Sequence, residues 1–358
     1  MRWLLPCSLA LGLATASATA AACMWDRDTL AMERKTWPET AALIAGKFLR
    51  HGDAFYEWRV EDRRARLVDE PDALPLMDDL GVALDKLGRH HEAIAVATTA
   101  LEIDPNRYET HANLGTFHVH AGELEVGLRH IERSLAINPD AHFGRERYQK
   151  LLVEHLLCRA ADGAECSDFA YFVTRQPDVG DEFAELERAQ AGVEGMMRFG
   201  DHTSPVLLEA LGSLLTRQTY EGRGYRPGRL AALAYARAMM GTHDETAKDA
   251  LELAGWVALE SEVGSDFVTL QYTLRWDVAD AEAWFAQIRD DELRWIADPD
   301  VDPDSAYEAK YYREPWVDDE AEEPERPRAP GSDWAWLLWI PAGGAVLTLV
   351  LGRAHAMS

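Results

Sequence analysis

One stretch of this sequence occurs twice, and the two copies are separated by a constant interval. The first copy reads DLGVALDKLGRHHEAIAVATTALEIDP and ends at Pro105, and the second reads NLGTFHVHAGELEVGLRHIERSLAINP and ends at Pro139. Identical residues recur at matching positions in the pairs Leu80/Leu114, Gly81/Gly115, Gly88/Gly122, Leu101/Leu135, Ile103/Ile137 and Pro105/Pro139. This 34-residue period indicates a repeat architecture in which each unit stacks on the next.

Each 34-residue unit is predicted to form two antiparallel helices joined by a tight turn. Gly88 and Gly122 supply the permissive backbone that such a turn needs. Pro105 and Pro139 end the second helix, because proline cannot continue it. A single unit of this kind cannot cover its own apolar face, so flanking helices have to complete the stack. The pattern therefore predicts an all-α fold, built as a solenoid of helical hairpins.

Residues 74–141 resemble two tetratricopeptide repeats in their Leu-Gly pairs, turn glycines, small residues at helix crossings and terminal prolines. The resemblance implies a superhelix whose inner face binds a partner polypeptide, and it implies no catalytic activity. One departure is Gly127, which stands where the family has alanine and predicts looser packing in the second unit. The segments CMWDRDTLAMER and NPDAHFGRERYQKLLVEH also resemble a set of exported bacterial repeat proteins of unknown function.

The sequence on either side of the two repeats also has helical periodicity. Residues 23–73 form an N-terminal helical segment, within which residues 40–73 are either a degenerate third repeat or an unrelated stretch. Pro71 favours the repeat, because it keeps the 34-residue interval. Residues 142–168 are predicted to hold a capping helix, and residues 169–312 a second helical section.

The overall composition limits the kind of partner. The chain has 358 residues, of which 47% are hydrophobic, and a formal net charge of -26. That hydrophobic content is enough for a sizeable buried core. The negative charge opposes nucleic acid and anionic membrane surfaces, which are bound through basic patches. We therefore expect no nucleic-acid partner, and a basic or polar protein partner fits the charge.

The N-terminus has the order of a secretory signal peptide. Residues 1–22 carry one positive charge, then an apolar run, then small residues with Ala-x-Ala cleavage options. In an oxidising compartment Cys158 and Cys166 are a candidate disulfide, because they are close enough in sequence to close a small loop. Cys23 is then left over, either as an acylated cysteine of the lipoprotein type or as a free or buried thiol.

The C-terminus contains a candidate transmembrane helix. Residues 334–352 hold no charged residue, and about 19 helical residues cover the ~30 Å hydrocarbon core of a bilayer. Tryptophans cluster before this segment's midpoint and Arg353 follows it, which places the short tail 353–358 in the cytoplasm. Residues 313–333 form an acidic, proline-rich linker. We therefore expect a cell-envelope protein, with a periplasmic body anchored in the inner membrane, unless the span is a cleaved sorting tail.

No pattern of catalytic or cofactor-binding residues is found in the sequence. His-Glu-x-x-His, nucleophile-elbow, phosphate-loop and dinucleotide-binding motifs are absent. The best histidine cluster is His111, His118 and His120, and packing is favoured over metal binding because no cysteine or carboxylate completes a ligand spacing. His90 and His91 lie at a helix start and are expected to face solvent. The sequence therefore predicts no enzyme, no cofactor and no metal.

The remaining candidate site is the inner groove formed by the first helices of the repeats. In the family that the repeats resemble, this surface holds ligand segments. The resemblance therefore assigns partner binding to Asp78, Asp85, Lys86, Glu109, Asn113, Thr116 and His120. Asp78, Asp85 and Glu109 outweigh the one lysine, so this surface is acidic, which favours a basic or hydroxyl-bearing peptide as the partner.

Together these features predict a membrane-anchored periplasmic scaffold that mediates protein-protein interactions through its concave face. Two alternatives stay open. One is an envelope enzyme or enzyme subunit with its site in residues 169–312; a deep pocket with converging histidines and carboxylates would favour it over a flat stacked surface. The other is a lipoprotein assembly factor held at Cys23.

Overall fold

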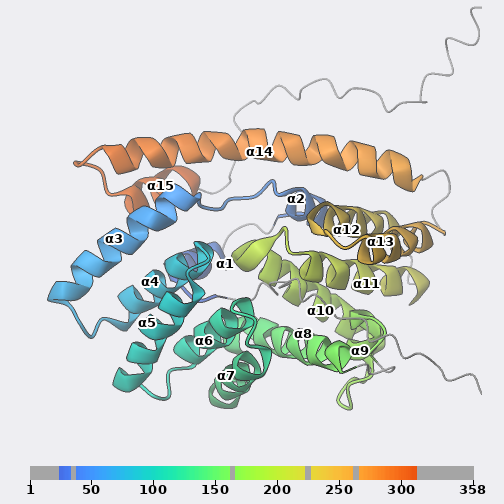
Figure 1. Ribbon diagram of the computed structural model, residues 1–358, viewed down its shortest axis with the longest axis horizontal. Coiled ribbons are helices and arrows are strands. Elements are labelled where there is room, and N and C mark those ends of the chain that lie inside the picture. The colour runs from blue at the N-terminus through green and yellow to red at the C-terminus, as the bar shows by residue number, and fades with distance from the viewer. Residues whose placement is uncertain (1–23, 34–37, 162–165, 222–226, 261–265, 313–358) are drawn as a thin grey trace, which may run out of the picture. The chain divides into compact units, whose positions relative to one another are not determined.

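The computed structural model describes residues 24–33, 38–161, 166–221, 227–260 and 266–312, and every secondary-structure element in these ranges is a helix (Figure 1). The predicted all-α class is confirmed for this part of the chain. The helices are α1 (Arg27–Glu33), α2 (Thr40–Ala45), α3 (Asp53–Asp69), α4 (Leu74–Lys86), α5 (His90–Ile103), α6 (Tyr108–His120), α7 (Leu124–Ile137), η1 (Ala141–Gly144), α8 (Arg145–Ala160), α9 (Phe169–Thr174), α10 (Glu182–Met196), η2 (Met197–Asp201), α11 (Pro205–Glu221), α12 (Gly228–Gly241), α13 (Glu245–Ala258), α14 (Phe267–Ala297) and α15 (Pro303–Tyr311).

The repeated stretch of sequence folds into two hairpins with matching boundaries. α4 and α6 begin and end at equivalent positions of the repeat, and so do α5 and α7. Gly88 and Gly122 lie in the turns with positive φ values of 72° and 82°, a conformation that glycine adopts without a steric penalty. An equivalent backbone hydrogen bond closes each turn: Arg89 N donates to the oxygen of Leu84, and one repeat later Glu123 N donates to the oxygen of His118. These residues form a helical-repeat solenoid.

The second hairpin is tightly packed where α6 crosses α7. A Cβ atom on Gly127 would lie 2.7 Å from the carbonyl oxygen of Gly115 and 2.7 Å from Cγ2 of Val119. A Cβ atom on Gly115 would lie 2.6 Å from Cγ1 of Ile131. The prediction that Gly127 loosens this unit is therefore wrong, because the absence of a side chain is what lets the two backbones approach each other.

The segment before the hairpins keeps the repeat register at its two ends. α2 begins one full period before α4, and α3 ends one full period before the end of α5, but α2 stops at Gly46, which has a φ of 91°. A Cβ atom at Gly46 would also lie 2.7 Å from Nε2 of His202, so both conformation and space require glycine. Between α2 and α3 the chain leaves the helical path, and this detour is the main departure from a third repeat.

Helices α8 to α13 extend the stack beyond the hairpins. α8 packs on α7 and α10, α11 packs on α10 and α12, and α13 packs on α12. α8 provides the predicted capping helix: its residues Tyr148, Leu151 and Leu152 are buried and Leu156 is half-buried. Cys158 at the end of α8 is joined to Cys166 by a disulfide, with their Cα atoms 6.0 Å apart.

The last helices return to the first ones. In Figure 1 the long α14 runs along one side of the molecule, from α12 and α13 past α2 to α3. α15 packs on α14, where Tyr307 and Tyr311 join an apolar cluster with Trp284, Phe285 and Ile288. The solenoid is therefore closed on itself, because its C-terminal helices pack on its N-terminal ones.

Within the described ranges, no helix has both the length and the apolar character needed to cross a bilayer. The predicted signal segment 1–22 and Cys23 lie outside the described residues. The predicted linker 313–333, span 334–352 and tail 353–358 also lie outside them. These assignments therefore stay predictions.

Replacing Gly127 with alanine is expected to lower the free energy of unfolding by about 1–3 kcal/mol, because the added methyl group meets backbone atoms of α6. The midpoint of urea unfolding, followed by circular dichroism, measures the loss. The matched control is Gly180→Ala, where a Cβ atom meets nothing within 4 Å and stability should hold or rise slightly. Equal midpoints for the two variants would contradict a close crossing.

One buried histidine makes the stability of the fold depend on pH. His155 is packed against Phe169 and Phe172, with ring centroids 5.7 and 5.4 Å away. Burial lowers the pKa of His155 from 6.5 to about 4, and the charge of Arg159 acts in the same direction. Below pH 6.5 the unfolded chain binds a proton that the folded chain takes up only near pH 4. The folded state therefore loses stability as the pH falls through this window.

Replacing His155 with leucine is expected to remove this part of the pH dependence. Unfolding midpoints are measured for both proteins between about pH 7 and pH 4, the window set by the lowered pKa. The original protein should lose stability faster than the variant as the pH falls, because only the original carries the buried imidazole. Parallel pH profiles would contradict a neutral buried ring.

Candidate functional site

A cavity of about 590 Å³ lies where α14 closes against the repeats. Its wall combines the loop between α2 and α3, the ends of α4 and α6, the start of α5, the turn at residues 198–202, and α14. The charged and polar lining residues are Arg50, His51, Asp53, Tyr56, Asp85, Lys86, His90, His120, Arg198, Asp201, His202, Glu282 and Arg289. The volume falls within the range of small-ligand sites, so this cavity is the candidate functional site.

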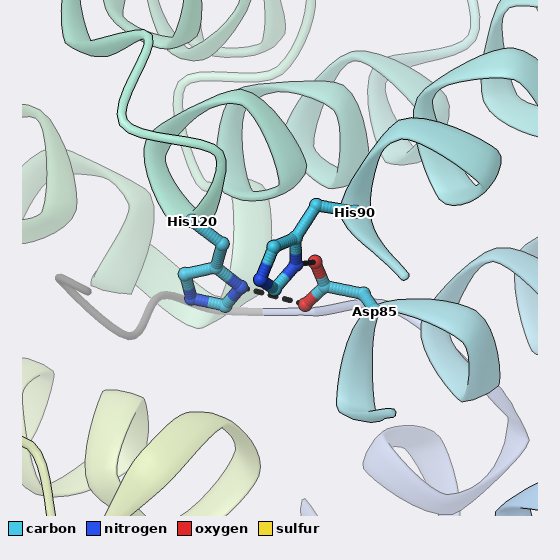
Figure 2. A group of neighbouring side chains, drawn as sticks. All are labelled: Asp85, His90 and His120. Carbon is cyan, nitrogen blue, oxygen red and sulfur yellow. Dashed lines mark hydrogen bonds and ion pairs between the residues drawn. The ribbon is translucent and has the colours of Figure 1, made fainter. Parts of the chain in front are cut away.

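Asp85, His90 and His120 meet at one side of this cavity (Figure 2). Asp85 precedes the last residue of α4, His90 begins α5, and His120 ends α6. Nδ1 of His90 lies 2.7 Å from Oδ1 of Asp85, and Nδ1 of His120 lies 2.6 Å from Oδ2. Figure 2 shows both imidazole rings turned toward the one carboxylate. Two helical hairpins thus contribute to a single polar group.

The two histidines keep Asp85 ionised. Burial acts to raise the pKa of Asp85, but His120 and His90 outweigh it and lower this pKa to about 2. The hydrogen bond with Asp85 in turn raises the pKa of His90. The side chains of Asp85 and His120 are only 1% and 9% exposed, so these interactions are little screened by water. Nε2 of His120 is buried and has no hydrogen-bond partner among the described residues.

Cationic side chains face the same cavity. Burial lowers the pKa of Arg50 and the pKa of Lys86. Burial and the charge of Arg50 lower the pKa of His202 to about 3, so this ring is neutral. Arg289 stacks on Phe285 and forms no ion pair with any described residue. Burial of these cations is compensated only in part, by Glu282 at 3.0 Å from Arg50 and by the charge of Asp201 near Lys86.

His51 connects the cavity wall to a group of buried charges, which we call the ionic cluster: Asp28, His51, Arg59, Arg63, Asp79, Glu292 and Asp304. Arg59 donates to Asp28 and to Asp304, at 2.7 Å in both cases. Arg63 donates to Asp79 at 3.0 Å and to the other oxygen of Asp304. The cluster therefore joins α1, α3, α4, α14 and α15.

The first described residues of the chain lie on the inner face of the repeats. The side-chain amide of Asn113 accepts from the backbone nitrogen of Trp25 at 2.7 Å and donates to its carbonyl oxygen at 3.1 Å. The backbone nitrogen of Arg27 donates to Asp79 at 3.1 Å. Both contacts hold the main chain rather than a particular side chain. This segment of the same chain thus occupies part of the surface that was predicted to receive a partner's peptide.

Only some of the seven residues predicted to form the groove line the cavity. Asp85, Lys86 and His120 line the cavity, whereas Asp78, Glu109, Asn113 and Thr116 do not. Lys86 donates to the carbonyl oxygen of Gly200 at 2.5 Å. The end of α4 is therefore tied to the turn between α10 and α11, which belongs to the second helical section.

The other groove residues make internal contacts. Both oxygens of Asp78 accept from Arg107, at 2.7 and 2.5 Å, and Glu109 lies 3.8 Å from the same guanidinium. Thr116 accepts from Gln149 at 3.1 Å. A basic partner was predicted because these carboxylates make the surface acidic. Most of them are buried and already paired within the protein. Partner binding by these residues stays a prediction.

The three histidines predicted to form a cluster, His111, His118 and His120, do not all lie together, and only His120 lines the cavity. Nδ1 of His111 lies 3.2 Å from Nδ1 of His130 on α7, and His118 stacks on the same ring with centroids 5.4 Å apart. His120 instead lines the cavity, where its ring centroid lies 5.6 Å from that of His90. The expectation that His90 and His91 face solvent is confirmed for His91, which is exposed, but not for His90, whose side chain is 24% exposed and bonded to Asp85.

The ionic cluster could not be read directly from the sequence, because its members are far apart along the chain. Arg59 and Asp304 are separated by 245 residues. One local signal was present: Arg59 and Arg63 stand four residues apart on α3, on the helical face that also buries Phe55 and Val60. Charges on an otherwise apolar face require buried counter-charges from elsewhere in the fold.

No model of a known protein family matches this sequence, and no curated protein sequence matches it either. Functional inference therefore depends on the geometry of the cavity and on the repeats.

Replacing Asp304 with asparagine is expected to lower the free energy of unfolding by about 3–5 kcal/mol, because Arg59 and Arg63 then stay buried with too little counter-charge. Urea unfolding followed by tryptophan fluorescence measures the loss. The matched control on the same helix is Glu308→Gln, whose carboxylate is 41% exposed and pairs only with Arg27, for an expected loss below about 1 kcal/mol. Similar losses in both variants would show that the ionic cluster does not secure α15.

Proposed function

We propose that this chain is a helical-repeat binding protein of the cell envelope, which captures a partner polypeptide by taking an acidic side chain or chain end into its cavity. The observation that carries the proposal is the convergence of distant segments on one polar cavity whose cations are incompletely stabilised. A scaffold or adaptor role follows from this capture. The proposal assigns no reaction to the chain.

The repeats support a polypeptide as the ligand. Residues 74–141 keep matching helix boundaries from one unit to the next, and we assign them to the tetratricopeptide class. Asn113 already holds the backbone of Trp25 through both its amide atoms, which is how an extended peptide can be bound without regard to its side chains.

The paired carboxylates change the expected charge of the partner. A basic partner was predicted because Asp78 and Asp85 were taken to be free on the inner face. Asp78 is paired with Arg107, and Asp85 with two histidines. Among the cavity cations, Arg289 has no counter-ion among the described residues, so an acidic group is the better complement.

The placement in the envelope is part of the proposal, and the sequences of the two termini support it. A signal-like segment at residues 1–22 favours export, and the uncharged stretch at residues 334–352 favours a single C-terminal anchor. Acylation at Cys23 is the alternative mode of attachment. Mass determination of the mature N-terminus distinguishes a lipoprotein from a chain held only by its C-terminal span.

An enzyme is the second candidate, because histidines and carboxylates do converge on a cavity to which the 169–312 section contributes Asp201, His202 and Glu282. Two features favour binding over catalysis. No serine, threonine or cysteine is among the described residues that line the cavity. His202, with a pKa of about 3, is a poor general base near neutral pH.

Site-specific photocrosslinking in intact cells tests the binding proposal. A photoreactive phenylalanine derivative replaces Ala54, which is exposed at the cavity, or Thr98, which is exposed on α5 and does not line it. We expect a partner adduct from position 54 and none from position 98. Adding Arg289→Glu should reduce the adduct about tenfold, equivalent to about 1.4 kcal/mol, because it reverses a charge that faces the ligand.

The control for the charge reversal is Arg275→Glu, which makes the same change at another exposed position of α14 outside the cavity. Its adduct yield should match that of the original chain. Adducts of equal intensity from positions 54 and 98, or equal losses from the two arginine variants, would overturn the proposal that the cavity binds an acidic group.

A further inference from the structure

We propose that Asp85, His90 and His120 form a binding site for a transition-metal ion of the zinc class, with a coordination position open to the cavity. In the described part of the chain, this is the one group of three histidine, cysteine or carboxylate residues whose ligand atoms lie close enough to share an ion. The inference does not depend on the proposed partner, because the ion binds to side chains of this chain alone.

The ligand chemistry and the spacing both fit such an ion. Two imidazoles and one carboxylate are ligands that zinc accepts at about 2.0–2.2 Å, so two atoms bound to one ion are at most ~4.3 Å apart. One ligand atom from each of the three residues lies within 4.8 Å of the other two. Small rotations of the side chains are enough to bring these atoms into a common coordination shell.

The backbone holds the three residues in place. Asp85 and His90 flank the turn at Gly88 within one hairpin, and His120 ends the first helix of the next hairpin. His120 occupies the position in the second repeat that Lys86 occupies in the first, so the repeat register itself brings it beside Asp85 on the inner face. Ligands carried by packed helices and a tight turn are preorganised, which favours metal binding.

An independent observation points to a ligand at this position. The side chain of His120 is 9% exposed and lines the cavity, and its Nε2 atom has no hydrogen-bond partner among the described residues. A buried polar atom without a partner is costly, so a native structure normally provides one. We therefore assign Nε2 of His120 to the ion; Nδ1 then loses its hydrogen bond with Asp85, whose carboxylate becomes the third ligand.

The position of the site gives the ion a role in the cavity. All three residues line it, and three protein ligands leave a zinc ion with a fourth position for water or for an oxygen of a bound molecule. The ion would add positive charge to a wall that already holds Arg50 and Lys86. The metal site therefore also fits the binding of an acidic group, although it is tested separately.

The competing interpretation is a purely structural group in which Asp85 accepts two hydrogen bonds and no ion binds. Metal titration separates the two. Full-length protein without an affinity tag, solubilised in detergent and treated with a chelator, is titrated with Zn²⁺ against a chromophoric competitor and with Co²⁺ by visible absorption. We expect one ion per chain and Co²⁺ bands that indicate nitrogen ligands.

Variants of the two histidines locate the ion. His90→Gln and His120→Gln should each weaken Zn²⁺ binding by more than about 100-fold, beyond the 10–100-fold that loss of an outer-shell partner costs. The matched control is His118→Gln, on the same helix as His120 but stacked on His130, and its affinity should be unchanged. His90 is 24% exposed, so its variant keeps the test available if replacement of His120 prevents folding, which circular dichroism reveals.

Three results would overturn the site: no zinc binding by the original protein, equal affinity in His90→Gln and the original, or an equal loss in His118→Gln. Failure of the proposed function has a different outcome. If Arg289→Glu leaves partner capture intact while zinc binding still requires His90, the acidic-partner proposal falls and the metal site stands. If zinc binding is absent while Arg289→Glu abolishes capture, the reverse holds.

Discussion

The two guanidinium groups that α3 buries determine how the ends of this solenoid meet. Arg59 and Arg63 are each 1% exposed, and an uncompensated charge at such a position costs several kcal/mol. Their counter-charges come mainly from three other helices, Asp28 on α1, Asp79 on α4 and Asp304 on α15, while Asp62 of α3 itself also pairs with Arg63. Because Asp304 pairs with both guanidinium groups and Asp28 with Arg59, full neutralisation requires the first and last described helices to pack against α3. Apolar contacts between α14 and α15 stabilise that arrangement, and the ionic cluster makes it specific.

The cavity follows from this closure. In a regular third repeat the helix of α2 would continue almost to the start of α3. Instead α2 stops at Gly46, where the positive φ and the nearby ring of His202 both require glycine. The detour that follows carries Arg50 and His51 to the inside of the solenoid, opposite the ends of α4 and α6. The loss of repeat regularity at this point is thus the structural origin of the cavity.

Local and periodic features of the fold could be predicted from the sequence, and contacts between distant segments could not. The repeat period was sufficient to predict the two hairpins, because each depends on turn glycines and on apolar faces within the unit. It also placed Asp85 and His120 on one inner face. It could not show that α14 returns to α3, since nothing near Asp304 indicates the arginines that it neutralises. The role of Gly127 was misjudged for the same reason: its effect depends on how closely two helices cross, which composition does not reveal.

The net charge of the chain is also a poor guide to its inner surface. A formal charge of -26 suggested a basic partner, yet Asp78 and Asp85, two of the carboxylates on which that prediction rested, are paired within the protein. Successive repeats then place a lysine and a histidine, Lys86 and His120, at equivalent positions beside Asp85. The cavity is lined by Arg50, Lys86, Arg198 and Arg289 as well as by Asp53, Asp85, Asp201 and Glu282, so its local field differs from that of the strongly acidic chain as a whole. We propose that this local field, rather than the net charge of the chain, selects the ligand.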